Sequence, residues 1–127
     1  MLEQIINSII TLDEQINYDT LELQVAIRFS NNSLAFSGHF ERFPVLAGAY
    51  QLCLFKHFAS KLLKSELITE QIVKVRLADF VKPDDEISIK LKITPNIVKS
   101  REFKVFSKLI KNKKRVTTAT MILNKSD

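Results

Sequence analysis

The stretch FSGHFERFPVLAG, residues 36–48, decides the fold of this 127-residue chain. It contains both glycines of the sequence, Gly38 and Gly48. Glycine is used where the chain must turn tightly or where another group approaches the backbone closely. Because a glycine-poor sequence places both of its glycines around His39, a functional site is first expected in this segment.

A helix is predicted directly after this stretch, over residues 47–64. Long apolar side chains recur there at helical spacing. One stripe consists of Leu52, Phe55, Ala59 and Leu62, and close beside it lie Tyr50, Leu54 and Phe58. A helix that is apolar over most of its circumference is expected inside a fold rather than on its surface.

One strand is predicted before residues 36–48. Residues 20–29 alternate apolar and polar side chains, as a half-buried strand does. Residues 5–12 are apolar and β-branched and fit either a strand or a short helix. Residues 13–14 and 17–19 are predicted to form a turn, and residues 30–33 are predicted to form a loop.

After the helix, four strands rich in Val, Ile, Phe and Thr are predicted, at residues 72–81, 86–94, 101–109 and 115–123. Turns are expected between them at residues 82–85, 94–96 and 111–114. Short connections between successive strands predict an antiparallel meander. The pattern predicts an α+β fold in one domain, residues 1–127, and by itself also fits a cystatin-like sheet.

Composition excludes several classes of protein. Apolar residues make up 46% of the chain and charged residues 26%, as in an ordinary globular protein. No apolar run approaches the roughly 18 residues that a membrane span needs, and the N-terminus lacks a secretory signal, so a cytoplasmic location is predicted. The single cysteine, Cys53, can form no internal disulfide and no Cys-rich zinc site.

The net charge of +5 is distributed unevenly. Residues 1–55 hold Arg28 and Arg42 against six acids, whereas residues 56–127 hold seventeen bases against eight acids. A basic surface attracts nucleic acid, acidic lipid or an acidic protein by long-range, salt-sensitive steering. The alternative interpretation is a solvated, lysine-rich surface without a partner.

The motif resembles the signature of the β-hydroxyacyl acyl-carrier-protein dehydratases, G-H-F-P-x-x-P-V-x-P-G. The matching positions are Gly38, His39, Phe40, Pro44, Val45 and Gly48. A second, weaker match lies in residues 77–85, similar to the strand and turn F-x-R-P-V-x-P-G-D of that family. The resemblance implies the hotdog fold, in which one buried central helix is wrapped by a long antiparallel sheet.

The resemblance also implies roles for individual residues. His39 would be the base that removes a proton beside the thioester carbonyl, since imidazole titrates near neutrality. The backbone N–H of Gly48, at the helix start, would stabilise the developing negative charge. Substrate contacts would come from Phe40, Pro44, Val45 and Ala49.

One expected group is missing. The family has a Glu or Asp fourteen positions after the His, where this chain has Cys53, and a Gln four positions later, where it has His57. Positions i and i+4 share a helical face, so Cys53 and His57 are expected to point the same way. His57 is then either a substitute proton donor or a core histidine satisfied by a hydrogen bond. A Cys–His nucleophilic pair is a third possibility, without a visible orienting group.

Other polar residues give weaker hypotheses. Glu41 replaces a Pro of the signature and could turn toward the site, although a charge in a loop is usually solvated. Asp79 is expected at the surface or in a salt bridge. The acidic run at residues 84–86 suggests a cation site, but it lies on a predicted hairpin turn, and turn chemistry explains it. Two histidines and one cysteine give no convincing metal-ligand set, so neither a metal nor a cofactor is predicted.

The leading functional hypothesis is a dehydratase or hydratase acting on β-hydroxyacyl groups carried by acyl carrier protein or coenzyme A, in fatty-acid or specialised polyene and polyketide metabolism. The alternatives are a catalytically impaired acyl-binding partner subunit and, third, a hotdog thioesterase. A nucleic-acid binder ranks last, because the basic run at residues 111–115 has no interleaved aromatic residues. A homodimer is predicted, because a lone hotdog sheet leaves an edge strand uncovered.

Overall fold

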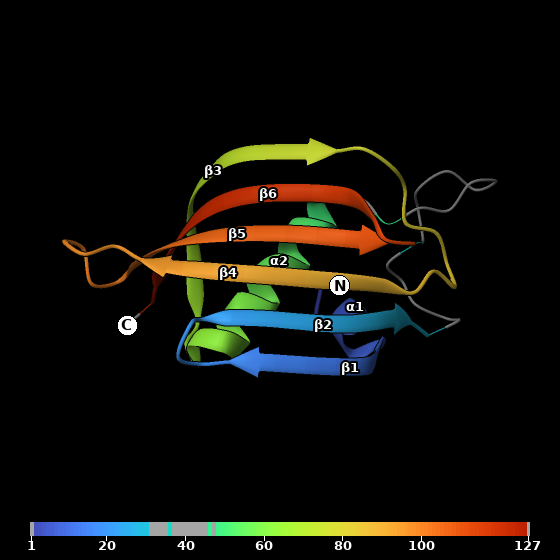
Figure 1. Ribbon diagram of the computed structural model, residues 1–127, viewed down its shortest axis with the longest axis horizontal. Helices are drawn as coiled ribbons and strands as arrows, with labels where there is room; N and C mark the ends of the chain where they lie inside the picture. The colour runs from blue at the N-terminus through green and yellow to red at the C-terminus, as the bar shows by residue number, and fades with distance from the viewer. Residues whose placement is uncertain (1, 31–35, 37–45, 47, 127) are drawn as a thin grey trace.

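A computed structural model describes residues 2–30, 36, 46 and 48–126 of the chain (Figure 1). These residues form two helices and six strands, an α+β fold as predicted. In chain order the elements are α1 (Leu2–Asn7), β1 (Ile9–Asn17), β2 (Glu22–Phe29), α2 (Gly48–Leu63), β3 (Leu67–Leu77), β4 (Ile87–Pro95), β5 (Glu102–Lys111) and β6 (Lys114–Lys125).

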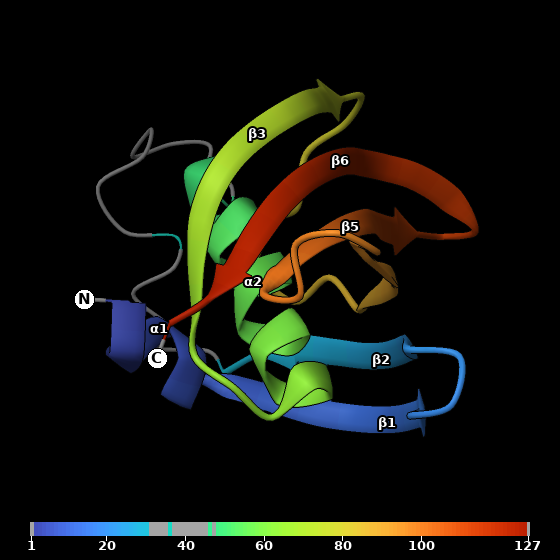
Figure 2. The same cartoon turned by 90° about the vertical axis from the view of Figure 1, so that its left-hand side faces the viewer.

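All six strands belong to one antiparallel sheet with the order β1-β2-β4-β5-β6-β3. The sheet curls around α2, which lies in its hollow (Figure 2). The prediction of one central helix wrapped by a long antiparallel sheet is therefore confirmed. The edges of the sheet are β1 and β3.

The core fills the space between α2 and the hollow side of the sheet. The buried stripe of α2 consists of Gln51, Leu54, Phe55, Phe58, Ala59 and Leu62. Alternate residues of the strands meet it, among them Val25, Ile27, Ile89, Val105 and Leu123, each with no exposed surface. Full burial of one such apolar side chain contributes about 1.5–3 kcal/mol. The apolar side chains that recur at helical spacing in α2 and at every second residue in the strands thus pack into one core.

The predicted four-strand meander is wrong in one respect. Only β4, β5 and β6 follow each other in the sheet, because β3 pairs with β6 rather than with β4. Strand alternation fixes which face of a strand is buried, but it carries no information on which neighbour the strand takes. The consequence is that β3 lies at the far edge of the sheet (Figure 1).

The first strand is also longer than predicted. Residues 13–14 form no turn, because β1 continues through them with a register shift between Thr11 and Asp13. Within this strand, Glu14 accepts a hydrogen bond of 2.6 Å from Lys61 of α2, so β1 is held to the helix by an ion pair. The turn at residues 17–19 is confirmed, since Asn17 Oδ1 accepts the N–H groups of Asp19 and Thr20.

Turn chemistry accounts for the loops between the later strands. The β5–β6 hairpin turns at Asn112 and Lys113, with φ of 52° and 64°. Positive φ at both central residues is the requirement of the type I′ hairpin turn. The turn expected at residues 94–96 begins later, since Pro95 is the last residue of β4 and Asn96 Oδ1 accepts the N–H groups of Val98 and Lys99.

Candidate functional site

The predicted site residues fall into two groups. Gly48, Ala49, Cys53 and His57 lie on α2 and are described by the structure. The others, His39, Phe40, Pro44 and Val45 together with Glu41, lie outside the described residues. The structure therefore places the helical half of the predicted site and leaves the role of His39 as a prediction.

Gly48 is the first residue of α2, as the motif predicts. The first N–H groups of a helix have no acceptor within the helix and lie at the positive end of its dipole. The α2 start is held in place because the N–H of Leu46 donates to the carbonyl of Val81 at 2.8 Å. A Cβ at position 48 would lie 3.1 Å from Leu77 Cδ1, so a glycine allows β3 to approach the helix start closely.

A buried polar contact, which the motif does not indicate, ties this helix start to β6. Gln51 is 2% exposed and its Nε2 donates to the carbonyl of Leu46 at 3.1 Å. Its Oε1 accepts a hydrogen bond from the hydroxyl of Thr117, which is 1% exposed. The only signal in the sequence is a Gln within the apolar stripe of α2. Gln51 thereby fixes the backbone just before Gly48 relative to the sheet.

Cys53 and His57 share the side of α2 that faces away from its buried stripe. At about 100° per residue, position 53 lies roughly opposite positions 51, 55 and 58, and position 57 lies beside it one turn later. Both side chains are half-buried. The expectation that they point the same way agrees with this placement, and they do not belong to the core stripe.

Burial lowers the pKa of His57 below its usual value of 6.5, and the charge of Lys61, one turn along α2, lowers it further. The ring of His57 packs edge-to-face against Phe58, with 5.0 Å between the ring centres. At neutral pH the imidazole is therefore uncharged. A neutral imidazole is a weaker proton donor than an imidazolium ion, which counts against His57 as a simple replacement for a carboxylic acid.

The acidic residues near the β3–β4 connection have structural partners. Lys111 Nζ lies 3.3 Å from Asp85 Oδ2 and 4.0 Å from Asp79 Oδ2, and it donates to the carbonyl of Phe80 at 2.7 Å. Asp85 also accepts the N–H of Lys82 within the turn. Turn formation and ion pairing explain these carboxylates. Within the described ranges, no group of three His, Cys, Asp or Glu residues is placed to hold a metal ion.

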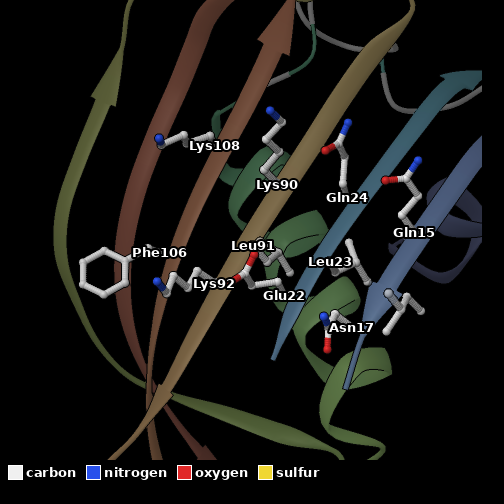
Figure 3. Close-up of a pocket in the computed structure, with 11 residues that line it drawn as sticks. Gln15, Asn17, Glu22, Leu23, Gln24, Lys90, Leu91, Lys92, Phe106 and Lys108 are labelled. Carbon is white, nitrogen blue, oxygen red and sulfur yellow. The ribbon is translucent and has the colours of Figure 1, made fainter. Parts of the chain in front are cut away.

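A groove of about 510 Å³ lies on the other face of the sheet, away from α2 (Figure 3). Its rim carries Gln15, Asn17, Glu22, Gln24, Lys90, Lys92, Phe106 and Lys108, which come from four neighbouring strands. The groove contains none of the predicted site residues. It is a separate surface feature that the sequence motif does not indicate.

Solved structures show which class of protein this architecture defines. The dehydratase heterocomplex ApeI:P from Xenorhabdus doucetiae matches with a TM-score of 0.73 and 18% identity, over 91% of this chain and 97% of that chain. A hypothetical thioesterase with coenzyme A from Streptococcus pneumoniae matches with a TM-score of 0.69 and 14% identity, over 99% and 91% of the two chains. A Streptococcus mutans protein bound to acetyl coenzyme A matches with a TM-score of 0.65 and 14% identity, over 93% and 88%. The chain has the hotdog fold.

The family is identified by sequence. The family model described as ApeI dehydratase matches residues 14–119, which include the His39 motif and all of α2. This chain belongs to the ApeI-like dehydratase family. A search of curated proteins finds no match. None of the described helices is long and apolar enough to cross a membrane.

Proposed function

We propose that this protein dehydrates β-hydroxyacyl thioesters, with His39 as the base. The observation that carries the proposal is the family match over residues 14–119, because it spans both the segment that holds His39 and the helix that begins at Gly48. Two of the similar solved structures are described with coenzyme A or acetyl coenzyme A, which supports a thioester substrate. Acyl carrier protein and coenzyme A are the candidate carriers, and fatty-acid or polyene metabolism the candidate context.

The proposed reaction needs three groups. His39 takes the proton from the carbon beside the thioester carbonyl, and the electron pair left behind moves toward the carbonyl oxygen. The N–H of Gly48, with the α2 dipole behind it, stabilises the resulting negative charge. The electron pair then forms the carbon–carbon double bond as the β-hydroxyl departs, and a proton donor completes the water molecule that leaves.

The proton donor is the member of this set for which α2 supplies no carboxyl group. Cys53 occupies the position of the carboxyl residue in the resembling family, and α2 contains no Asp or Glu between Gly48 and Leu63. His57 lies beside it but is uncharged at neutral pH, because its pKa is lowered. This observation favours a second candidate function, an acyl-binding subunit whose partner supplies the acid. The heterocomplex described for the Xenorhabdus protein supports keeping this candidate.

A thioesterase is the third candidate, since the pneumococcal protein is described as a hypothetical thioesterase. Hotdog thioesterases usually rely on a carboxylate of the central helix. The absence of Asp and Glu from α2 weakens this candidate as much as it weakens the dehydratase. The family match then favours dehydration.

The proposal is tested by incubating the protein with β-hydroxyacyl coenzyme A and with the same acyl group on acyl carrier protein, and measuring formation of the unsaturated thioester. His39→Ala is expected to lower the rate by about 10²–10⁴, the usual contribution of a general base. Lys99→Glu, an exposed change in the β4–β5 connection, is the control and is expected to leave the rate unchanged. Equal rates for His39→Ala and the parent protein would exclude His39 as the base, and free thiol release without an unsaturated product would indicate a thioesterase.

We also propose that two copies associate through β3. This edge strand exposes Ile68, Ile72, Val73, Val75 and Leu77, each with 39–56% of its surface accessible. Unpaired backbone groups beside exposed apolar side chains favour pairing with another strand. Such an association would continue the sheet and cover the apolar side chains of β3.

A further inference from the structure

The registers of the sheet align mainly polar side chains in two rows on the face away from α2. The first, the Lys90 row, crosses all six strands and consists of Gln15, Gln24, Lys90, Lys108, Thr118 and Arg76. The second, the Lys92 row, consists of Asn17, Glu22, Lys92, Phe106, Thr120 and Lys74. Figure 3 shows the first four positions of each row lying side by side across the groove.

The two rows are strongly basic. Their charged side chains are Lys74, Arg76, Lys90, Lys92 and Lys108 against the single carboxylate of Glu22, and all are exposed. Lys104, two residues before Phe106 on β5, adds another cation on this face. In the described part of the chain, the ion pairs of the protein involve none of these side chains. The face therefore carries unneutralised positive charge.

This arrangement costs the isolated protein stability. Lys90 and Lys108 are direct cross-strand partners, and like charges placed directly opposite each other in a sheet are destabilising. A local arrangement that opposes folding is typically found where function requires it. The juxtaposition of Lys90 with Lys108 thus suggests that a negatively charged group binds between them.

An apolar contact lies within the same face. Phe106 is 40% exposed, and Lys104 Nζ lies 5.2 Å from the centre of its ring. Phe106 borders the groove of about 510 Å³ together with Lys92 and Lys108. A ligand that fits this face must therefore combine negative charges with an apolar group.

We propose that the Lys90 and Lys92 rows form a docking surface for an acidic helix of another protein. Neighbouring rows are two residues apart along a strand, or about 6.6–6.8 Å. Carboxylates four residues apart on a helix are separated by about 6 Å along its axis, so successive acidic turns can meet both rows. An apolar residue on the same helix would cover Phe106.

Two other occupants fit this face less well. A second copy would bring its own basic rows against these, and the two would repel each other. A nucleic acid would meet the carboxylate of Glu22 and a single aromatic ring, whereas single strands bind on several stacking platforms. Because α2 and Gly48 lie on the opposite face of the sheet, the proposed surface does not depend on dehydratase activity.

The test uses a synthetic helical peptide with glutamates four residues apart and one leucine among them, and a twin with glutamine in place of every glutamate. The glutamate peptide is expected to bind the full chain in a salt-sensitive manner, and the glutamine twin is expected not to bind. Lys90→Glu combined with Lys108→Glu is expected to raise the Kd at least about tenfold. Isothermal calorimetry at two salt concentrations measures both effects.

The matched control is Lys99→Glu combined with Lys113→Glu, which makes the same change in net charge at two turns outside the rows. It is expected to change the Kd by no more than about twofold. Lys90→Glu alone serves if the double variant fails to fold, because the new carboxylate lies opposite Lys108 and pairs with it. This single variant is expected to fold and to weaken binding.

Three results would overturn the proposal. The first is no binding of the glutamate peptide to the parent protein. The second is equal weakening by the row variants and the control variants, which would mean that net charge alone attracts the peptide. The third is tighter binding of a single-stranded oligothymidylate that the same row substitutions abolish, which would identify the face as a nucleic-acid surface.

Discussion

Position 53 decides whether the proposed reaction has a proton donor. Restoring a carboxyl by Cys53→Asp or Cys53→Glu is expected to raise the dehydration rate, since the departing hydroxyl would then receive its proton from a positioned acid. The expected gain is about 10²–10⁴, the usual contribution of such a group. Steady-state assays of unsaturated thioester formation measure it. Cys53→Ser, of nearly the same size and uncharged, is the matched control and is expected to bring no gain.

His57 is the alternative proton donor, and its substitution gives a different set of expected rates. If His57 is the donor, His57→Gln abolishes turnover while Cys53→Asp changes little. A donor imidazole must carry its second proton. Because the pKa of His57 lies below 6.5, the rate should then fall as the pH rises through the pKa of His57. A rate that holds above pH 7 in the parent protein would contradict this role. Thermal unfolding of each variant shows whether an added carboxylate has only destabilised α2.

Gly48 and Gln51 illustrate what a sequence motif can and cannot indicate. The motif predicts Gly48 at the start of α2, because a glycine there belongs to a local pattern of turn and helix. It does not indicate Gln51 and Thr117, which are distant in sequence and meet only once β6 lies against the helix. Contacts of this kind are products of tertiary packing and leave no local spacing to detect.

At the scale of elements, the Gln51–Thr117 hydrogen bond links α2 to β6. Gln51→Leu or Thr117→Val leaves a buried polar partner unsatisfied, so each is expected to lower the free energy of unfolding by about 1–3 kcal/mol. The double variant is expected to cost less than the sum of the two, because the substituted groups contact each other. Urea unfolding of the four proteins measures this coupling.

Ser107 offers a matched control for the comparison of the Gln51 and Thr117 variants. It is 2% exposed and lies on the same face of the sheet as Thr117, but its Oγ has no hydrogen-bond partner among the described residues. Ser107→Ala removes a buried hydroxyl that makes no bond, so it is expected to leave stability unchanged or to raise it. A loss as large as that of Thr117→Val would show that any change at a buried hydroxyl destabilises this sheet, whatever its bonding.

The elements themselves differ in how well the sequence predicts them. The predicted helix over residues 47–64 matches α2 closely, since a long apolar helix has a strong period. The strand predicted at residues 72–81 instead runs over Leu67–Leu77. Nearly every side chain of β3 is exposed, and its alternation of apolar and polar residues over residues 73–77 does not extend to its first half, where the register with β6 shifts twice. Without a buried face, a strand lacks the pattern that would fix its ends.

At the scale of the whole molecule, the exposed β3 edge predicts the oligomeric state. Ile72→Lys places a charge on this edge and is expected to convert the proposed dimer to a monomer of 14.6 kDa, because an edge lysine opposes strand pairing. Sedimentation velocity at micromolar concentration measures the change.

The other edge strand supplies the control for this experiment. Leu12 of β1 is 44% exposed, close to the 47% of Ile72, and Leu12→Lys is expected to leave the dimer intact. A parent protein that already sediments as a monomer would refute association through β3. Dissociation by both variants would show that the effect of lysine is not specific to β3.

The register of β3 also determines the order in which the chain can fold during its synthesis. Leu77 pairs with Thr117 and Leu67 with Lys125, so β4 and β5 are translated before β3 can acquire its neighbour. Pairings between such distant segments form slowly. Until β6 is synthesised, the nascent chain exposes the apolar side chains of β3, and both backbone edges of this segment are unpaired. A ribosome-bound chaperone would find its substrate there, and aggregation would begin there if β6 were delayed.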